Sequence, residues 1–105
     1  SWQEKTVEYD FETAIKYRPR YSATRVLFGR YLHKEGRLNE ALKTYTEAEK
    51  LEPNSADVHY YLGLLYLDMK NNEKARQHAE IAYRSGQKLP DLRDRLTKAG
   101  LWKTN

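Results

Sequence analysis

A spacing of 34 residues recurs along this chain and constrains its fold more than any other feature. Similar residues stand one such spacing apart five times: Gly29 and Gly63, Ala41 and Ala75, Ala48 and Ala82, Phe28 and Leu62, and Pro19 and Pro53. A fixed period of about 20 to 50 residues is typical of stacked arrays, in which each repeat is one small supersecondary unit. Arrays of this kind usually hold other chains on their surface, so the period favours a binding module over an enzyme.

The segments between the turns of the repeat have the periodicity of α-helices. Apolar residues there follow the spacing of one helical face, with charged residues opposite. Pro19 and Pro53 end helices, because proline lacks an amide hydrogen and restricts the residue before it. We expect Ser22 and Ser55 to act as N-caps and Gly86 as a C-terminal cap. The expected helices span residues 3–17, 22–35, 38–51, 56–69, 72–85 and 90–100.

Two glycines in mid-helix predict close packing within each helix pair. Glycine inside a helix costs roughly 1 kcal/mol relative to alanine, so its presence favours a site where another group comes close. We expect Gly29 and Gly63 each to face the alanine that lies early in the partner helix, Ala41 and Ala75 respectively.

The set of repeated residues resembles the tetratricopeptide repeat family, whose unit is a helix–turn–helix of 34 residues. The matching residues are Leu62-Gly63, Tyr66, Ala75 and Ala82 in one repeat, Phe28-Gly29, Ala41, Tyr45, Ala48 and Pro53 in the repeat before it, and Phe11, Ala14 and Pro19 in a preceding, truncated repeat. The resemblance implies an all-α fold, a right-handed superhelix of antiparallel helix pairs with about six helices.

The same resemblance implies one domain over residues 1–105. Within it we expect the second helix of a truncated repeat, two full repeats and a C-terminal capping helix. Their respective bounds are 1–21, 22–55, 56–89 and 90–105. Because the chain begins with serine inside a repeat, we expect it to be a piece of a longer protein.

One departure from the family pattern predicts unfilled space in the last helix pair. The late aromatic of the repeat is Phe11 and then Tyr45, but Ala79 in the last pair. We hypothesise that Leu101 or Trp102, which follow the last helix, fold back to fill the space.

In this family the first helix of each pair lines a concave groove, and the resemblance transfers that role to three segments here. Their side chains would give an apolar centre flanked by basic groups, which suits a peptide with apolar anchors and acidic residues. Each residue also has a simpler interpretation, as a packing residue or a solvated charge. The candidate groove residues are Val26, Arg30, His33, Lys34, Tyr60, Leu64, Leu67 and Lys98.

A subset of the family clamps the terminal carboxylate of chaperone tails with lysine and asparagine. This chain has Val26 and Arg30 at those positions of the first repeat, and Asp57 and Tyr61 in the second. We therefore do not predict that it binds chaperone tails in this way.

Two alternatives to a peptide groove stay open. The N-terminal helix has no partner helix before it, so it could serve in self-association as a homo-oligomer. Residues 17–21 interleave tyrosine with arginine, a composition compatible with RNA, which some helical repeats read. The formal net charge of +4 is spread over the chain, which argues against nucleic acid.

No constellation of residues predicts catalysis, a metal site or a cofactor. There is no cysteine, and His33, His59 and His78 lack the spacing of a helical metal site. No apolar run approaches the roughly 18 residues of a membrane span. A chain without cysteine is compatible with either a reducing or an oxidising compartment. The style of the irregular repeats resembles that of bacterial proteins.

Overall fold

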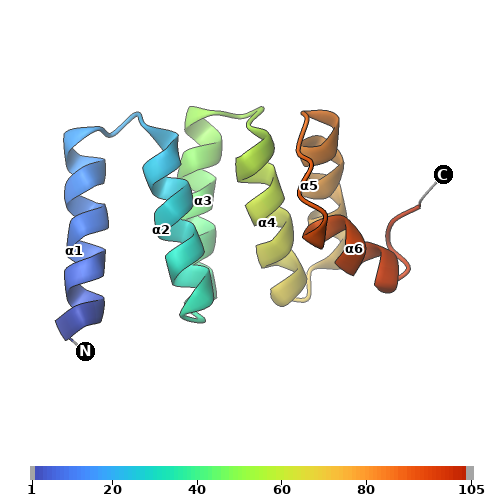
Figure 1. The fold of residues 1–105 in the computed structure, drawn as a ribbon, viewed down its shortest axis with the longest axis horizontal. Helices are drawn as coiled ribbons and strands as arrows, with labels where there is room; N and C mark the ends of the chain where they lie inside the picture. The colour runs from blue at the N-terminus through green and yellow to red at the C-terminus, as the bar shows by residue number, and fades with distance from the viewer. Residues whose placement is uncertain (1, 104–105) are drawn as a thin grey trace. The chain divides into compact units, whose positions relative to one another are not determined.

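A computed structural model describes residues 2–103, and this part of the chain contains six α-helices and no β-strand (Figure 1). Every expected helix is present, and the observed ends differ by at most two residues from those expected. The prediction of an all-α fold is confirmed. The helices are α1 (Trp2–Tyr17), α2 (Ser22–Lys34), α3 (Leu38–Leu51), α4 (Ala56–Asp68), α5 (Asn72–Arg84) and α6 (Asp91–Lys98).

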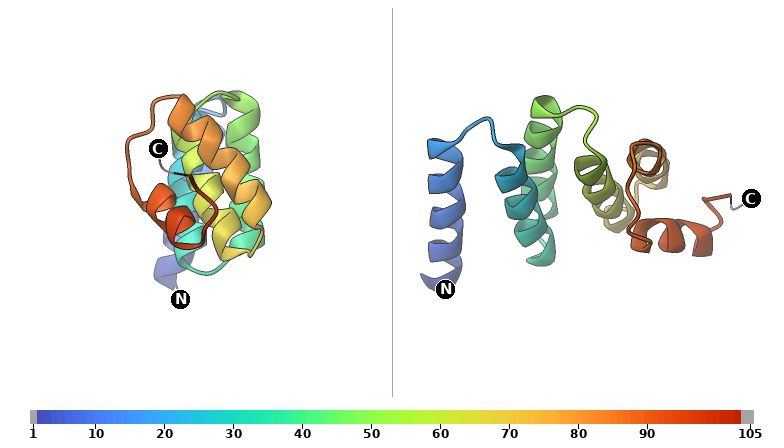
Figure 2. Two further views of the ribbon diagram at one scale, coloured as in Figure 1. Left: turned by 90° about the vertical axis from the view of Figure 1, so that its right-hand side faces the viewer. Right: turned by 45° about the horizontal axis from the view of Figure 1, so that its top comes forward.

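The helices form two compact units, and the boundary in the chain follows Pro53. The first unit contains α1, α2 and α3, and its tightest packing is the antiparallel pair of α2 and α3. The second contains α4, α5 and α6, and is built on the antiparallel pair of α4 and α5. In the first unit, α1 packs more sparsely, against α2. In the second, α6 contacts both α4 and α5 and crosses α5 steeply (Figure 2, right).

Two of the three expected helix caps are present. The Ser55 hydroxyl accepts a hydrogen bond from the Val58 amide at the start of α4. Gly86 follows α5 with a φ of 105°, a conformation that glycine adopts without a steric penalty. The expectation for Ser22 was wrong. It is the first residue of α2 and is buried, while Tyr21 occupies the N-cap without a capping side-chain hydrogen bond.

The mid-helix glycines accommodate large side chains, and of the two expected alanines only Ala75 is among the nearest neighbours of a Cβ on its glycine. A Cβ on Gly29 would lie 2.6 Å from Cδ1 and 2.8 Å from Cζ of the fully buried Tyr45 ring. A Cβ on Gly63 would lie 2.6 Å from the Leu92 side chain, nearer than the Ala75 carbonyl oxygen at 3.4 Å. The absent side chain in each case provides space that one large neighbour fills.

Leu92 therefore occupies the space that the small Ala79 leaves open, which we had expected Leu101 or Trp102 to fill. Leu92 and Ala79 are both fully buried in the core of the second unit. Leu101 and Trp102 do fold back onto this core, but they lie half-buried at its edge. The Trp102 ring packs edge-on against Tyr83, with ring centroids 5.5 Å apart.

Candidate functional site

The first four candidate groove residues lie on α2 and form what we call the α2 surface: Val26, Arg30, His33 and Lys34. Val26 and His33 are half-buried, while Arg30 and Lys34 are exposed. The buried residues of α2 are others, so this set borders solvent. The exposed Leu27 adds apolar area beside it. The α2 surface thus offers mixed basic and apolar groups.

Three candidates on the second unit form the α4–α6 surface: Leu64, Leu67 and Lys98. Both leucines pack against the core of the unit yet stay partly exposed, and Lys98 is exposed at the end of α6. An ion pair of 2.7 Å from Arg95 Nη2 to Asp68 Oδ1 links α6 to α4. These three residues thus provide partly exposed apolar side chains on α4 and an exposed cation on α6.

Tyr60, the fourth candidate on this unit, is a core residue. It is only 3% exposed, and its ring packs edge-on against Tyr61 and Tyr83, with centroids 5.1 Å and 6.4 Å away. Burial raises the pKa of its hydroxyl, with the Tyr83 side chain adding to the effect. A side chain so enclosed has little surface to offer a partner, so we attribute a packing role to Tyr60.

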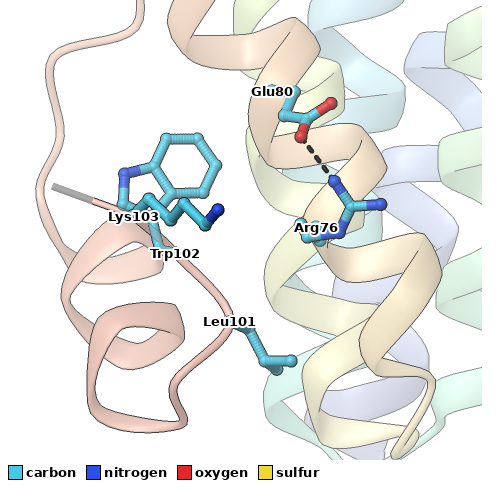
Figure 3. Close-up of a pocket in the computed structure, with 5 residues that line it drawn as sticks. All are labelled: Arg76, Glu80, Leu101, Trp102 and Lys103. Carbon is cyan, nitrogen blue, oxygen red and sulfur yellow. Dashed lines mark hydrogen bonds and ion pairs between the residues drawn. The ribbon is translucent and has the colours of Figure 1, made fainter. Parts of the chain in front are cut away.

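A pocket that the sequence did not indicate lies between α5 and the segment after α6 (Figure 3). Its volume is about 590 Å³. The Arg76 guanidinium on its wall donates hydrogen bonds to Glu80, at 2.5 Å, and to Glu73, at 2.6 Å. These contacts hold the pKa of the Glu73 carboxyl below its ordinary value. Arg76 is thus already paired within the unit. The lining residues are Arg76, Glu80, Leu101, Trp102 and Lys103.

Two histidines that looked unrelated in sequence form a pair. The Nδ1 atoms of His59 on α4 and His78 on α5 lie 2.8 Å apart, and the rings stack with centroids 5.1 Å apart. Burial, followed by the charges of His59 and Lys74, lowers the pKa of His78 to about 4. His78 is therefore neutral at pH 7. His59 is only 2% exposed and is therefore buried. Only the register of the α4–α5 hairpin brings the two together, and periodicity does not reveal that register.

The loop between α1 and α2 carries the arginine–tyrosine motif. The Arg18 guanidinium lies 4.2 Å from the centroid of the Tyr21 ring, a cation–π contact. Both residues line a pocket of about 420 Å³ together with Pro19 and Arg20. Tyr17 is 80% exposed next to it. Arginine and tyrosine side chains are of the types that stack on nucleic-acid bases. The hypothesis that this chain binds RNA stays a prediction.

Within the part of the chain that the structure describes, no helix is long and apolar enough to cross a bilayer.

Comparison with known proteins finds the same kind of repeat. A family model described as a TPR repeat matches residues 29–70. An Hsp70-Hsp90 organising protein of Plasmodium falciparum is 39% identical over 49 residues, which are 47% of this chain and 9% of that protein. A TPR repeat-containing thioredoxin of Arabidopsis thaliana is 37% identical over 84 residues, which are 80% of this chain and 12% of that protein.

This chain thus spans about a tenth of the length of the curated relatives that it matches. Neither of these relatives is bacterial, so they give no support to the bacterial style inferred from the sequence.

Proposed function

We propose that this chain, which carries tetratricopeptide repeats, is a protein–protein interaction module that binds a partner protein or an extended peptide. The observation that carries the proposal is the presence of part-exposed apolar side chains on the first helix of each pair, together with exposed cations on α2 and at the end of α6. On α4, Leu64 and Leu67 keep exposed area although they pack on the core. Exposed apolar area of this kind, bordered by polar groups, is typical of interaction sites.

The charges on these helices favour a partner with acidic residues. Lys34 on α2 and Lys98 at the end of α6 are exposed, and neither forms an ion pair within residues 2–103. Unpaired cations bordering an apolar surface steer and orient acidic partners. We therefore propose a peptide that combines apolar anchors with acidic side chains.

The name of one relative refers to chaperone organisation, but we do not extend chaperone-tail binding to this chain. The positions at which the resemblance places the carboxylate clamp hold Val26, Arg30, Asp57 and Tyr61. The Asp57 carboxylate also accepts a hydrogen bond from the Gln87 side chain, at 2.7 Å. An acid at such a position would repel a terminal carboxylate.

The name of the other relative includes a thioredoxin, and we do not propose that chemistry for this chain. The chain has no cysteine, so it cannot supply the thiolates of a redox pair. A role without catalysis fits the residues that are present.

Selection of random peptides displayed on phage, with the 105-residue chain as target, tests the proposal. We expect enrichment of peptides with apolar and acidic residues. Binding of a selected peptide, measured by calorimetry, should weaken about tenfold when the cation of the surface that it occupies is reversed. The variant is Lys34→Glu for a peptide on the α2 surface and Lys98→Glu for a peptide on the α4–α6 surface. Lys50→Glu, an exposed charge reversal on α3, is the matched control and should bind as the unmodified chain does.

Two results would contradict this proposal. One is a selection that enriches no peptide. The other is a set of peptides whose affinity falls equally in the control and in the matching test variant.

A second candidate function is self-association through α1, which a separate observation favours. No residue of α1 is buried. Trp2, Tyr9 and Tyr17 are 75%, 68% and 80% exposed. Large aromatic side chains at such exposure, spaced about two turns apart along one helix, favour a surface that another chain covers.

A further inference from the structure

His59 and His78 belong to the two helices of the hairpin on which the second unit is built. His59 lies on α4 and His78 on α5, and these two helices pack together more extensively than any other pair in the unit. His59 is buried, while His78 is half-buried. The spacing rule for metal ligands on one helix does not apply to a pair from two helices, so the sequence did not indicate this arrangement.

The separation of the two Nδ1 atoms suits two ligands of one metal ion. An imidazole nitrogen binds a first-row transition-metal ion at about 2.0 Å, so two nitrogens at neighbouring corners of a square-planar ion lie about 2.8 Å apart. At a tetrahedral ion they lie about 3.3 Å apart. The observed separation of 2.8 Å therefore favours Cu²⁺ or Ni²⁺, whose nitrogen and oxygen sites are square-planar or tetragonal.

The His78 ring keeps a nitrogen lone pair available and is supported by its neighbours. Burial, followed by the charges of His59 and Lys74, lowers the pKa of His78 to about 4, so protons do not compete with a metal ion for this ring at pH 7. The Tyr66 ring stacks on the His78 ring, with centroids 5.4 Å apart and an angle of 14° between the planes. Packing of this kind restricts the orientation of the ring before a ligand binds.

We propose that His59 and His78 bind a divalent transition-metal ion through their two Nδ1 atoms, with Cu²⁺ preferred over Ni²⁺ and Zn²⁺. The ion takes the place of the hydrogen bond between the rings. The proton of the donating ring moves to the Nε2 of that ring, and both rings turn about their Cβ–Cγ bonds until the two lone pairs converge on the ion. Water completes the coordination from the partly exposed side of His78.

This site differs in kind from the partner-binding surfaces proposed above and does not depend on them. The bound ion cross-links α4 to α5. Because it binds the folded hairpin better than the unfolded chain, it stabilises the second unit.

Calorimetric titration of the 105-residue chain with Cu²⁺ at pH 6 tests the site, because His78 remains unprotonated at that pH. We expect one ion per chain, with a Kd of roughly micromolar order. The electron paramagnetic resonance spectrum of the bound Cu²⁺ should show coupling to two imidazole nitrogens. His78→Gln should weaken binding at least about tenfold and leave coupling to one such nitrogen. His33→Gln, at the remaining histidine, is the matched control and should bind as the unmodified chain does.

Lys74→Gln gives a result that a variant that fails to fold cannot produce. Lys74 is exposed, its charge acts on His78, and its Nζ lies 5.5 Å from the centroid of the Tyr66 ring. Removal of this cation should tighten Cu²⁺ binding about two- to threefold, because the ion and the ammonium group repel each other. Lys43→Gln, at an exposed cation on α3, is the control and should leave the affinity unchanged.

Three results would overturn the metal site. The first is a chain that does not bind Cu²⁺ at these concentrations. The second is an adventitious ion only, recognised by coupling to fewer than two imidazole nitrogens or by equal loss of affinity in His33→Gln and His78→Gln. The third is an affinity that is unchanged or weaker in Lys74→Gln, because the ion then lies away from His78. If His78→Gln does not fold, the spectrum of the unmodified chain and the Lys74→Gln titration still decide.

Discussion

Leu92 of α6 packs directly against Gly63 of α4, 2.6 Å from the point where a Cβ on that glycine would lie. In the first unit the Tyr45 ring occupies the corresponding place over Gly29. Ala79 is the counterpart of Tyr45 in the second hairpin, and its methyl group leaves a space that Leu92 fills. The last helix is thus part of the core of its unit and not only a polar cover.

Truncation of Leu92 should destabilise the second unit strongly. We expect Leu92→Ala to lower the free energy of unfolding by about 2 to 5 kcal/mol, because it removes a fully buried side chain and leaves a cavity over Gly63. Urea denaturation followed by circular dichroism measures the change. Leu89→Ala, at a residue 46% exposed, is the control and should change stability by less than about 1 kcal/mol. Equal effects of the two would contradict the packing role of Leu92.

Alanine at the two mid-helix glycines should have unequal effects. Gly29→Ala places a methyl group against the rigid, fully buried Tyr45 ring, and we expect a loss of about 1 to 3 kcal/mol. Gly63→Ala meets the end of the Leu92 side chain, which can rotate, and the gain in helix propensity of about 1 kcal/mol offsets part of the clash. Thermal unfolding of both variants gives the comparison. A larger loss for Gly63→Ala would show that the Tyr45 ring moves more easily than Leu92.

Acid should destabilise the fold through His78. Its folded-state pKa of about 4 lies below the ordinary value of 6.5, so protonation favours the unfolded chain. Its contribution to stability is fully present above pH 6.5 and is lost as the pH falls from 6.5 through about 4. Melting temperatures across this range, compared with those of His78→Gln, isolate the effect. We expect a shallower dependence in the variant, and parallel curves would contradict the lowered pKa.

The attachment of α1 should depend on a few side chains. The Phe11 ring stacks on Phe28 with centroids 5.1 Å apart, and Arg37 forms an ion pair with Glu8. We expect Phe11→Ala to speed amide hydrogen exchange throughout α1 about tenfold or more, because local opening of α1 then loses its main aromatic contact. Exchange in α3 should change little. Mass spectrometry of the peptides resolves the two helices, and equal acceleration in both would contradict a local effect.

Most local features could be predicted from the sequence, because they depend on neighbours along the chain. The turns at Pro19 and Pro53 and the apolar spacing between them correctly placed all six helices. Ser55 was identified as a cap by its type and position. The same reasoning failed for Ser22, because the turn before α2 begins the helix one residue earlier than the serine cap requires.

The candidate surface residues were only partly predictable, because exposure depends on which helices pack together. From helical spacing alone, we predicted that both Leu64 and Tyr60 would face a partner. The structure leaves Leu64 part-exposed and buries Tyr60 among other tyrosines. A residue's exposure is set by the side chains of α5 and α6 that surround it, and no spacing within α4 contains that information.

The sequence by itself determined the class of fold, the number of helices and the kind of repeat, since period, turns and helix ends are properties of adjacent residues. Only the tertiary structure decided that Leu92 fills the space beside Ala79 and that His59 contacts His78. These relationships join residues on different helices. They depend on helix register and on the volumes of facing side chains, which become fixed only when the helices pack.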